Sequence, residues 1–424
     1  MKLSQSFAKT TKDISKEEVS LNAQLLIKGG YVNKLMAGVY SYLPLGLKVL
    51  TNIENIVRDE MNKVGGQEVL LPALHPRENW ETTGRWDDLD VLFRLKGAGD
   101  KDLALGATHE EVITPLGQQM INSYKDMPVA AYQIQTKFRN EARAKSGILR
   151  GREFRMKDLY SFHTTQDSLD EYYKEVTQAY KNVYTRCGLG DITFFTHADG
   201  GTFSKFSHEF QTLTESGEDI IYLIPGTDEA INEEIINDVE ALKELIPGFK
   251  EGDEKNFKAV KAAEVGNIFK LGTKYSGAFN MQVADETGKL ITPVMGCYGI
   301  GTSRLMGTIA ECLSDDKGLV WPAEIAPYKV HMVTIVKGGE EVALCEDIYN
   351  KLNSSNLSTI MDDRAKVSVG AKLADADLLG MPYRVVIGKK TLEQASAEVT
   401  NRKTGETEMV KLDELVTYLQ AKLA

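Results

Sequence analysis

The sequence predicts an α/β protein: a large N-terminal α+β domain, built on an antiparallel sheet flanked by helices, followed by a smaller C-terminal α/β domain. Three observations support this prediction. Residues 131–141 alternate between two sets of side chains, and a second strand-like segment, 153–163, follows a polar loop, as in an antiparallel pair. Near the end of the chain, strand-like and helix-like segments alternate, which is typical of helices covering a largely parallel sheet. Between these regions, Ser314–Pro327 contains two prolines and several acidic residues, so we expect domains over residues 1–322 and 323–424.

The composition is that of an ordinary globular protein. The chain has 424 residues, of which 42% are hydrophobic and 26% charged, and this length suggests two or three domains. No apolar run approaches the ~20 residues of a membrane span. Residues 1–13 lack the apolar core of a secretory signal, so we expect a cytoplasmic protein with no membrane partner. The four cysteines are far apart with no C-x-x-C pair, which argues against structural zinc and disulfides.

The net charge of −11 means that any surface for nucleic acid has to be local. One stretch opposes the general trend. Residues 137–157 contain eight basic side chains against two acidic ones, a local charge of +6. Taken alone, such a run is explained by a solvated basic face as readily as by a site for an anion.

The first predicted unit is a helix followed by a short strand. Apolar residues recur at steps of three and four within Leu45–Val64, which follows a proline and precedes Gly65–Gly66, as in an amphipathic helix with its start and stop residues. Gln67–Leu71 is then expected to form a strand that ends at Pro72, since proline cannot donate to a ladder.

The same periodicities predict the remaining elements. In the N-terminal domain they indicate helices over Glu171–Tyr184, Ala230–Leu245 and Thr302–Leu313, and strands over Asp219–Ile224 and Leu290–Met295. In the C-terminal domain they indicate strands over Lys329–Val336, Leu357–Met361 and Tyr383–Ile387, and helices over Glu340–Leu352, Val369–Leu379 and Leu412–Leu423.

Two local patterns contain side chains that suit a nucleotide. Arg139, Glu141 and Phe154 supply a guanidinium for a phosphate, a carboxylate for an exocyclic amine and a ring for base stacking. Gly299-x-Gly at a helix start is followed by Arg304, whose charge opposes the helix dipole unless an anion is bound there. Each pattern alone also has a structural explanation, a sheet-surface salt bridge for the first and a simple turn for the second.

The combination is more specific than its parts. The helix and strand ending in proline, then F-R-N-E, a loop and R-E-F, then G-x-G-x-x-R, resemble in that order motifs 1, 2 and 3 of class II aminoacyl-tRNA synthetases. More closely, the chain resembles bacterial-type prolyl-tRNA synthetases nearly from end to end. The matching stretches are Ala37–Gly46, Trp80–Trp86, Ala107–Glu111, Gly151–His163, Ser207–Phe210, Leu271–Ser276, Gly296–Gly301, Trp321–Pro327 and Ala374–Pro382.

The resemblance implies a two-step reaction. Proline attacks the α-phosphate of ATP to give prolyl-adenylate and pyrophosphate, and the 3′-terminal ribose of tRNA(Pro) then takes the prolyl group. Mg²⁺ would bind through the ATP phosphates, without a protein metal site of its own. Motif 1 forms a dimer interface in this family, so the resemblance implies a homodimer, unless the apolar stripe of the first helix faces only its own core.

The resemblance also assigns the ATP-binding residues. Arg139 would clamp the α-phosphate and the proline carboxylate, and Glu141 would accept from the adenine amino group. Phe154 and Arg304 would lie on the two faces of adenine, with Arg304 also near the γ-phosphate. Arg139 and Arg304 are therefore the expected catalytic residues. Arg150 or Arg152 would meet the outer phosphates or the acceptor end of the tRNA.

For proline, the resemblance assigns Thr108 and Glu110 to the secondary ammonium and Arg139 to the carboxylate. It adds the three residues Asp158, His208 and Cys297 to the proline site, although Cys297 is equally explained as a small buried residue. His109 and His163 are expected to be structural. In the C-terminal domain, Asp363, Arg364 and Lys372 are the candidates for contacts with the anticodon, where surface charges are equally expected.

The chain departs from the family in three places. Many bacterial members carry a domain-sized editing insertion between motifs 2 and 3, but here only Thr164–Pro293 separates them, and Glu233–Ala263 is too short for a hydrolytic domain. We therefore expect no hydrolysis of alanyl-tRNA(Pro) by this chain. Phe203, Ser204 and Lys205 occupy places where the family has a glycine pair and its neighbour, and Asn267 replaces a histidine.

Two alternatives remain at this point. The chain could be another class II synthetase of the same subclass, for threonine, glycine, serine or histidine, although the scattered cysteines supply no obvious zinc ligands of the threonyl type. It could also be a synthetase-like subunit that binds nucleic acid without catalysis. The joint presence of Arg139, Glu141, Phe154 and Arg304 argues against the second alternative, and no DNA partner is expected.

Overall fold

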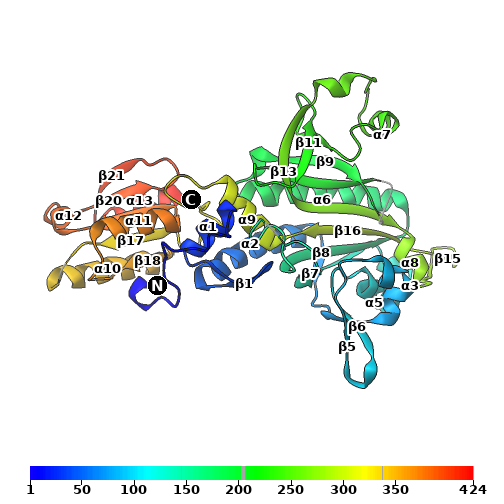
Figure 1. Ribbon diagram of the computed structural model, residues 1–424, viewed down its shortest axis with the longest axis horizontal. Helices are drawn as coiled ribbons and strands as arrows, with labels where there is room; N and C mark the ends of the chain where they lie inside the picture. Colours follow the sequence, from blue (N-terminus) through cyan, green and yellow to red (C-terminus); the bar gives the residue numbers. More distant parts are fainter. Residues whose placement is uncertain (145, 202–205, 337, 424) are drawn as a thin grey trace. The chain divides into compact units, whose positions relative to one another are not determined.

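The computed structural model describes residues 1–144, 146–201, 206–336 and 338–423 (Figure 1). Contacts divide the chain into two compact units. The larger unit contains Met36–Val39 and Glu54–Thr308, and the other contains Met1–Leu35, Tyr40–Ile53 and Ile309–Ala424. The sequence predicts a single boundary at residue 322, whereas each unit defined by contacts contains more than one segment of the chain. The boundary at residue 322 therefore stays a prediction. No helix within the described ranges is long and apolar enough to cross a bilayer.

A mixed sheet, with nine strands among the described residues, is the centre of the larger unit. Its strands are β3 (Gly66–Glu68), β7 (Val129–Phe138), β8 (Glu153–His163), β9 (Thr193–Asp199), β10 (Phe206–Leu213), β11 (Asp219–Leu223), β12 (Glu229–Asn232), β13 (Lys258–Gly272) and β16 (Val294–Ile300). Their order is β10-β9-β12-β11-β13-β16-β8-β7-β3. Only the pairs β9–β12 and β3–β7 are parallel, so the predicted antiparallel-rich sheet is confirmed.

The antiparallel pair β7–β8 is also confirmed, with Lys137 opposite Phe154 and Gln133 opposite Asp158. Directly opposed residues point to the same face of a sheet, so these four side chains share one face. Arg139 continues the alternation just past the end of β7, where its backbone N–H donates to the Arg152 carbonyl at 2.9 Å.

One face of this sheet is covered by α6 (Gln166–Arg186), which is longer than predicted (Figure 1). The helix begins after Thr165, whose side chain caps it by accepting from the Ser168 backbone N–H at 3.2 Å. Its apolar stripe, with Val176 fully buried, packs towards the sheet. Lys157 of β8 lies beneath the helix and donates to the Tyr180 hydroxyl at 2.6 Å. The candidate site described below therefore lies on the other face.

The larger unit also contains shorter elements around the sheet. These are α3 (Arg77–Thr82), α4 (Arg85–Asp88), α5 (Glu110–Met120), α7 (Val239–Leu245), α8 (Lys274–Ala278), the three-stranded sheet of β4 (Leu74–Pro76), β5 (Arg94–Lys96) and β6 (Asp102–Leu105), and the pair β14 (Val283–Ala284) and β15 (Leu290–Ile291). Two helices have residues in both units, α2 (Pro44–Lys63) and α9 (Thr302–Cys312). The hairpin of β1 (Val32–Met36) and β2 (Val39–Tyr42) also has residues in both units, whereas α1 (Leu21–Lys28) lies entirely in the other unit.

The prediction of one helix over Ala230–Leu245 is wrong. Residues 229–232 form β12, which pairs with β11 and β9, and only Val239–Leu245 is helical. Asp238 begins that helix by accepting from the Ala241 backbone N–H at 3.0 Å. Isoleucines at helical spacing, such as Ile231 and Ile235, are buried in a small core of their own, which strand and turn residues satisfy as well as a helix does.

The other unit is built on a five-stranded sheet in the order β18-β17-β19-β20-β21. Its elements are β17 (Val330–Thr334), α10 (Glu340–Ser354), β18 (Thr359–Asp362), α11 (Val369–Leu379), β19 (Tyr383–Ile387), α12 (Lys389–Glu393), β20 (Ser396–Asn401), β21 (Thr407–Lys411) and α13 (Leu415–Leu423). The three parallel strands β17, β18 and β19 confirm the prediction. The antiparallel strands β20 and β21 were not predicted.

The first residues of the chain extend the edge of this sheet. Lys2 forms a parallel bridge with Met361 of β18, whose backbone N–H donates to the Met1 carbonyl at 2.9 Å. The Ser4 hydroxyl donates to the Asp363 carboxylate at 2.6 Å. The N-terminal segment is therefore part of the fold of the C-terminal region.

Candidate active site

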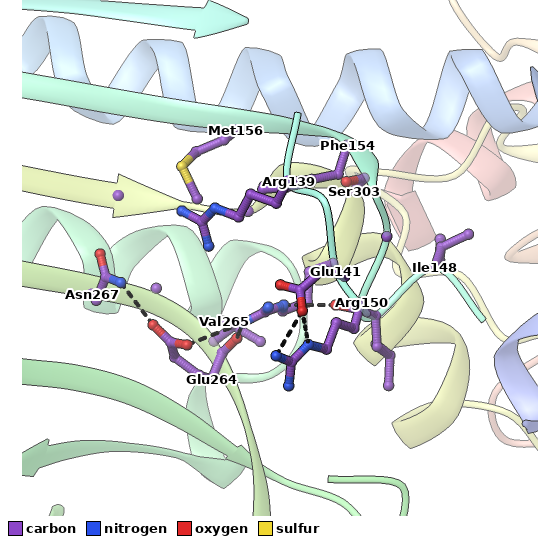
Figure 2. Close-up of a pocket in the computed structure, with 16 residues that line it drawn as sticks. Arg139, Glu141, Ile148, Arg150, Phe154, Met156, Glu264, Val265, Asn267 and Ser303 are labelled. Atoms are coloured by element: carbon purple, nitrogen blue, oxygen red, sulfur yellow. Dashed lines mark hydrogen bonds and ion pairs between the residues drawn. The ribbon is translucent and has the colours of Figure 1, made fainter. Parts of the chain in front are cut away.

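A pocket lies on the face of the central sheet opposite α6, where β7, β8, β13 and β16 approach the start of α9. Its lining residues are Arg139, Glu141, Ile148, Leu149, Arg150, Gly151, Phe154, Met156, Glu264, Val265, Gly266, Asn267, Gly299, Gly301, Ser303 and Arg304 (Figure 2). The two nucleotide-type patterns of the sequence therefore come together in one place, although more than 140 residues separate Phe154 from Gly299.

Arg139 is the cation at the end of β7 in this pocket. Its guanidinium carbon lies 5.2 Å from the centre of the Phe154 ring. Burial lowers the pKa of Arg139, and the positive charge of Arg304 lowers it further. Like charges disfavour each other, so an anion between the two guanidiniums would be favoured by both, although the carboxylates of Glu141 and Glu264 line the same pocket.

Arg304, in the first turn of α9, is fixed by three hydrogen bonds. Its Nε donates to the Leu149 carbonyl at 2.7 Å, and its Nη1 donates to the backbone carbonyl and to a carboxylate oxygen of Glu264 at 2.8 and 3.1 Å. Asn267 donates to the other Glu264 oxygen at 2.8 Å. Glu264 and Asn267 thus orient the arginine, which is a role that the sequence analysis did not give to either residue.

Glu141 lies beyond the end of β7 and accepts two hydrogen bonds from Arg150, at 3.1 and 2.9 Å (Figure 2). The same guanidinium donates to Glu218 at 2.8 Å. Arg152 differs from Arg150, because its guanidinium donates to the carbonyls of Glu141 and Ala37 at 2.9 and 3.0 Å and it is not among the lining residues. Of the two arginines predicted for the phosphates or tRNA, the structure places only Arg150 in the pocket.

Three of the residues predicted to bind proline form one cluster. Glu110, only 1% exposed, begins α5 and accepts from the Thr108 hydroxyl in a short hydrogen bond. The Cys297 thiol donates to the other Glu110 oxygen at 3.2 Å. Burial raises the pKa of the Cys297 thiol well above its usual value, so the thiol keeps its proton. The side chain of Arg139 reaches the same loop, since its Nε lies 3.5 Å from the Ala107 carbonyl.

Asp158 lies beneath this cluster, 3% exposed, in a network of ionic and hydrogen-bond contacts. Its carboxylate pairs with Lys137 at 2.7 Å and accepts from Gln133 and Tyr160, each at 3.0 Å. Lys137 also donates to the His109 ring at 2.8 Å, and the Tyr160 hydroxyl accepts from the His109 backbone N–H at 3.0 Å. The structure therefore gives Asp158 the position of a support for the 107–110 loop. Burial lowers the pKa of His109 to about 3, in keeping with the structural role expected of this histidine.

His208 is not brought to the proline cluster. In the sheet it is opposite Ile268, which is opposite Tyr298, so its side chain points to the α6 face, whereas Cys297 points to the site face. There its Nδ1 lies 2.7 Å from the Tyr173 hydroxyl and its ring stacks on Phe195 at 4.5 Å. The match of Ser207–Phe210 to a family motif identifies the strand on which His208 lies, but it does not identify the face of the sheet to which the side chain points. Phe203, Ser204 and Lys205 lie outside the described residues.

The three residues predicted for the anticodon lie around the end of β18. Asp363 accepts from Ser4, as described above. Arg364 pairs with Asp362 and Asp375 at 2.6 and 2.8 Å. Lys372, 4% exposed, donates to the carbonyls of Thr334 and Asp362 at 2.8 and 3.2 Å. Lys372 therefore holds loops of its own domain together, and Asp363 and Arg364 are the more accessible of the three.

Comparisons with known proteins show the family to which the chain belongs. Residues 93–312 match the tRNA synthetase class II core domain (G, H, P, S and T), and residues 329–422 match an anticodon binding domain. The chain is 35% identical to the proline–tRNA ligase of Bacillus mycoides (strain KBAB4) in an alignment 565 positions long, gaps included, which covers 99% of each protein. The chain belongs to the proline–tRNA ligase family. The enzyme of the same name from Bacillus cereus (strain G9842) matches with the same identity and coverage.

A solved structure of this family has the same fold. The crystal structure of prolyl-tRNA synthetase from Cryptosporidium parvum, complexed with L-proline and AMP, superposes with a TM-score of 0.76. The superposition covers 95% of this chain and 77% of the Cryptosporidium parvum chain, and the two sequences are 18% identical. The Bacillus family members align over more positions than the 424 residues present here, so they contain segments that this chain lacks.

Proposed function

We propose that this protein is a proline–tRNA ligase, which activates L-proline with ATP and transfers the prolyl group to tRNA(Pro), releasing AMP and pyrophosphate. The observation that carries the proposal is the arrangement of Arg139 between two groups of residues. On one side are Phe154, Glu141 and Arg304, which suit ATP. On the other side is the loop of Thr108 and Glu110.

The amino-acid end of the site has the charges that a zwitterion requires. Glu110 supplies an anion for the secondary ammonium, and Arg139 supplies a cation for the carboxylate. Proline held in this way presents a carboxylate oxygen to the α-phosphorus of ATP. That oxygen forms the new bond to phosphorus as the bond to pyrophosphate breaks. No protein nucleophile is needed, so the contribution of the site is positioning and charge stabilisation.

The nucleotide end has a carboxylate, a ring and two arginines. Phe154 and Arg304 would contact the two faces of adenine, and Glu141 would accept from its amino group. Arg150 would exchange its contact with Glu141 for the phosphates. No group of three or more histidine, cysteine, aspartate or glutamate side chains in the described parts of the chain could hold a metal. Glu264 and Glu141 supply carboxylate oxygens in the pocket, so Mg²⁺ would bind there only with ATP phosphates as further ligands, and it would then neutralise phosphate charge.

Amino-acid-dependent ATP–pyrophosphate exchange tests this proposal directly. We expect exchange to depend on proline and to exceed the exchange with alanine, threonine, glycine, serine and histidine. Threonine- or glycine-dependent exchange would instead assign the chain to a sibling synthetase. No exchange with any amino acid would indicate a binding subunit without catalysis.

The proposal includes a homodimer in the cytoplasm. The apolar stripe of α2 cannot form the dimer interface, because residues such as Val49, Ile53 and Val57 are fully buried within the chain. An exposed apolar side chain at the end of motif 1 offers an alternative contact: Leu70, just past β3, is 77% exposed.

We expect the purified enzyme not to deacylate alanyl-tRNA(Pro). In place of an editing domain, residues 224–257 form only a small core around Ile231 and Leu242. A proline pocket rejects a smaller apolar side chain by only about 1–3 kcal/mol, so alanine is expected to support measurable pyrophosphate exchange. Hydrolysis of preformed alanyl-tRNA(Pro) is measured with and without enzyme, and a catalytic rate above the spontaneous one would contradict this expectation.

A further inference from the structure

Two motifs of the sequence, Trp80–Trp86 and Leu271–Ser276, have no role in the mechanism above. The structure brings one side chain from each of them, Arg85 and Tyr275, to the start of α5. There they meet two successive buried glutamates, Glu110 and Glu111. Arg85 is thus placed beside two carboxylates, of which only Glu110 is proposed to bind the substrate.

The distances show that Arg85 lies closer to Glu111 than to Glu110. Its Nη1 lies 2.8 Å from Glu111 Oε1 and 3.0 Å from the Tyr275 hydroxyl, but 3.6 Å from Glu110 Oε2. The first two contacts are hydrogen bonds, and the third is a charge attraction beyond hydrogen-bond length. The Thr83 hydroxyl also donates to Glu111 Oε1, at 2.9 Å. Glu111 therefore lies in the contact network that fixes the position of the guanidinium.

Among the described residues, in contrast, the side chains that donate hydrogen bonds to the Glu110 carboxylate are neutral, the Thr108 hydroxyl and the Cys297 thiol. Neutral donors leave the carboxylate its full charge. A guanidinium in direct contact would occupy lone pairs of Glu110 and balance its charge, and the ammonium of an incoming amino acid would then have to displace it.

We propose that Glu111 is a positioning residue for the amino-acid pocket: by binding Arg85, it keeps the guanidinium off Glu110 and leaves that carboxylate open to the secondary ammonium of the substrate. This inference rests on the proposed function of Glu110. It assigns the W-E-T-T-G-R-W and L-G-T-K-Y-S stretches to the control of amino-acid affinity.

The decisive variant is Glu111→Gln, which keeps the shape of the side chain and removes its charge. Arg85 then moves the short distance to Glu110, and the KM for proline in ATP–pyrophosphate exchange rises by about tenfold or more, since a charged hydrogen bond contributes about 1.5–3 kcal/mol. The KM for ATP and the kcat stay within about twofold, because the ATP site is not altered.

The double variant Arg85→Met with Glu111→Gln separates positioning from mere support of the fold. If the harm in Glu111→Gln comes from the released arginine, removing that arginine lowers the KM for proline again. If Arg85 and Glu111 only support the fold, the second change adds to the damage. The matched control is Glu60→Gln, another buried glutamate bonded to an arginine, Arg186 at 2.7 Å, which is expected to leave the KM for proline unchanged.

A pH series on the wild type and the double variant tests the inference even if Glu111→Gln does not fold. Burial raises the pKa of Glu111 to about 6, and the groups facing it are Arg85, Glu110, Tyr275 and Lys274. Protonation of Glu111 releases Arg85, so the KM for proline rises more steeply between pH 7 and about 5.5 in the wild type than in the double variant.

Equal pH dependence in the wild type and the double variant overturns the inference, as does an unchanged KM for proline in Glu111→Gln. These outcomes are distinct from failure of the proposed function, which would appear as an absence of proline-dependent exchange in the wild-type enzyme.

Discussion

Replacement of Arg139 by glutamine is expected to lower kcat/KM for proline-dependent pyrophosphate exchange by about 10³-fold. In the proposed mechanism the guanidinium would contact both reacting groups, the proline carboxylate and the α-phosphate, and the glutamine amide has fewer donors and no charge. The Arg139 guanidinium also packs on the Phe154 ring, 5.2 Å from its centre, and so helps to hold this ring in the nucleotide pocket. ATP binding is therefore expected to weaken as well.

The measurement is steady-state exchange with proline and ATP varied in turn, together with a melting curve to show that the variant is folded. Arg143→Gln is the control, because Arg143 is an exposed arginine on the same basic loop. We expect this control to retain wild-type exchange. A loss of less than about tenfold in Arg139→Gln would assign the main charge stabilisation to another residue.

Replacement of Glu110 by glutamine is the second large effect. We expect kcat/KM for proline to fall by about 10²-fold, because an ion pair between buried groups becomes a neutral hydrogen bond. The amide oxygen can still accept from the Thr108 hydroxyl, so the loop keeps its contact. Binding of ATP is expected to change little, since Glu110 is not among the residues that line the nucleotide pocket.

Equilibrium binding of ATP and of proline, measured separately by calorimetry, distinguishes this variant from Arg139→Gln. Glu110→Gln is expected to lose affinity for proline alone, whereas Arg139→Gln loses affinity for both ligands. An equal loss for both ligands in Glu110→Gln would mean that the substitution disturbs the whole site.

The parts of the fold that could be predicted from the sequence are those with a strong local period and clear end residues. Glu153–His163 and Val369–Leu379 form β8 and α11 over the predicted ranges. The helix predicted over Ala230–Leu245 fails because isoleucines at helical spacing also suit a strand and a turn. Strands β20 and β21 were missed because they are short, and because they pair antiparallel with the preceding strand in the chain, outside the alternation of strand and helix that predicted the rest of this domain.

For the site, the sequence located residues whose partners follow from strand pairing. Arg139 and Phe154 meet because β7 and β8 form the antiparallel pair that the sequence predicts, although the sequence alone did not fix the register of the pair. His208 was misplaced because the face to which it points depends on the register of β10 with β13, which includes an irregularity at Phe210 and Gln211. Glu264 could not be identified, since its function is to orient Arg304 from a strand 40 residues away, and a side chain of this kind has no local pattern.

The pairing of the N-terminal segment with β18 has a consequence for synthesis of the chain. Ser4 and its partner Asp363 are separated by 359 positions, so the segment leaves the ribosome long before its partner strand exists. At roughly 5–20 residues per second, that interval is on the order of tens of seconds. During that time the hydrogen-bonding groups of the segment are available to other chains or chaperones. A C-terminal fragment that begins at residue 323 would conversely expose the edge of β18 that Met1 and Lys2 cover, so the two ends of the polypeptide have to be kept together when its parts are expressed separately.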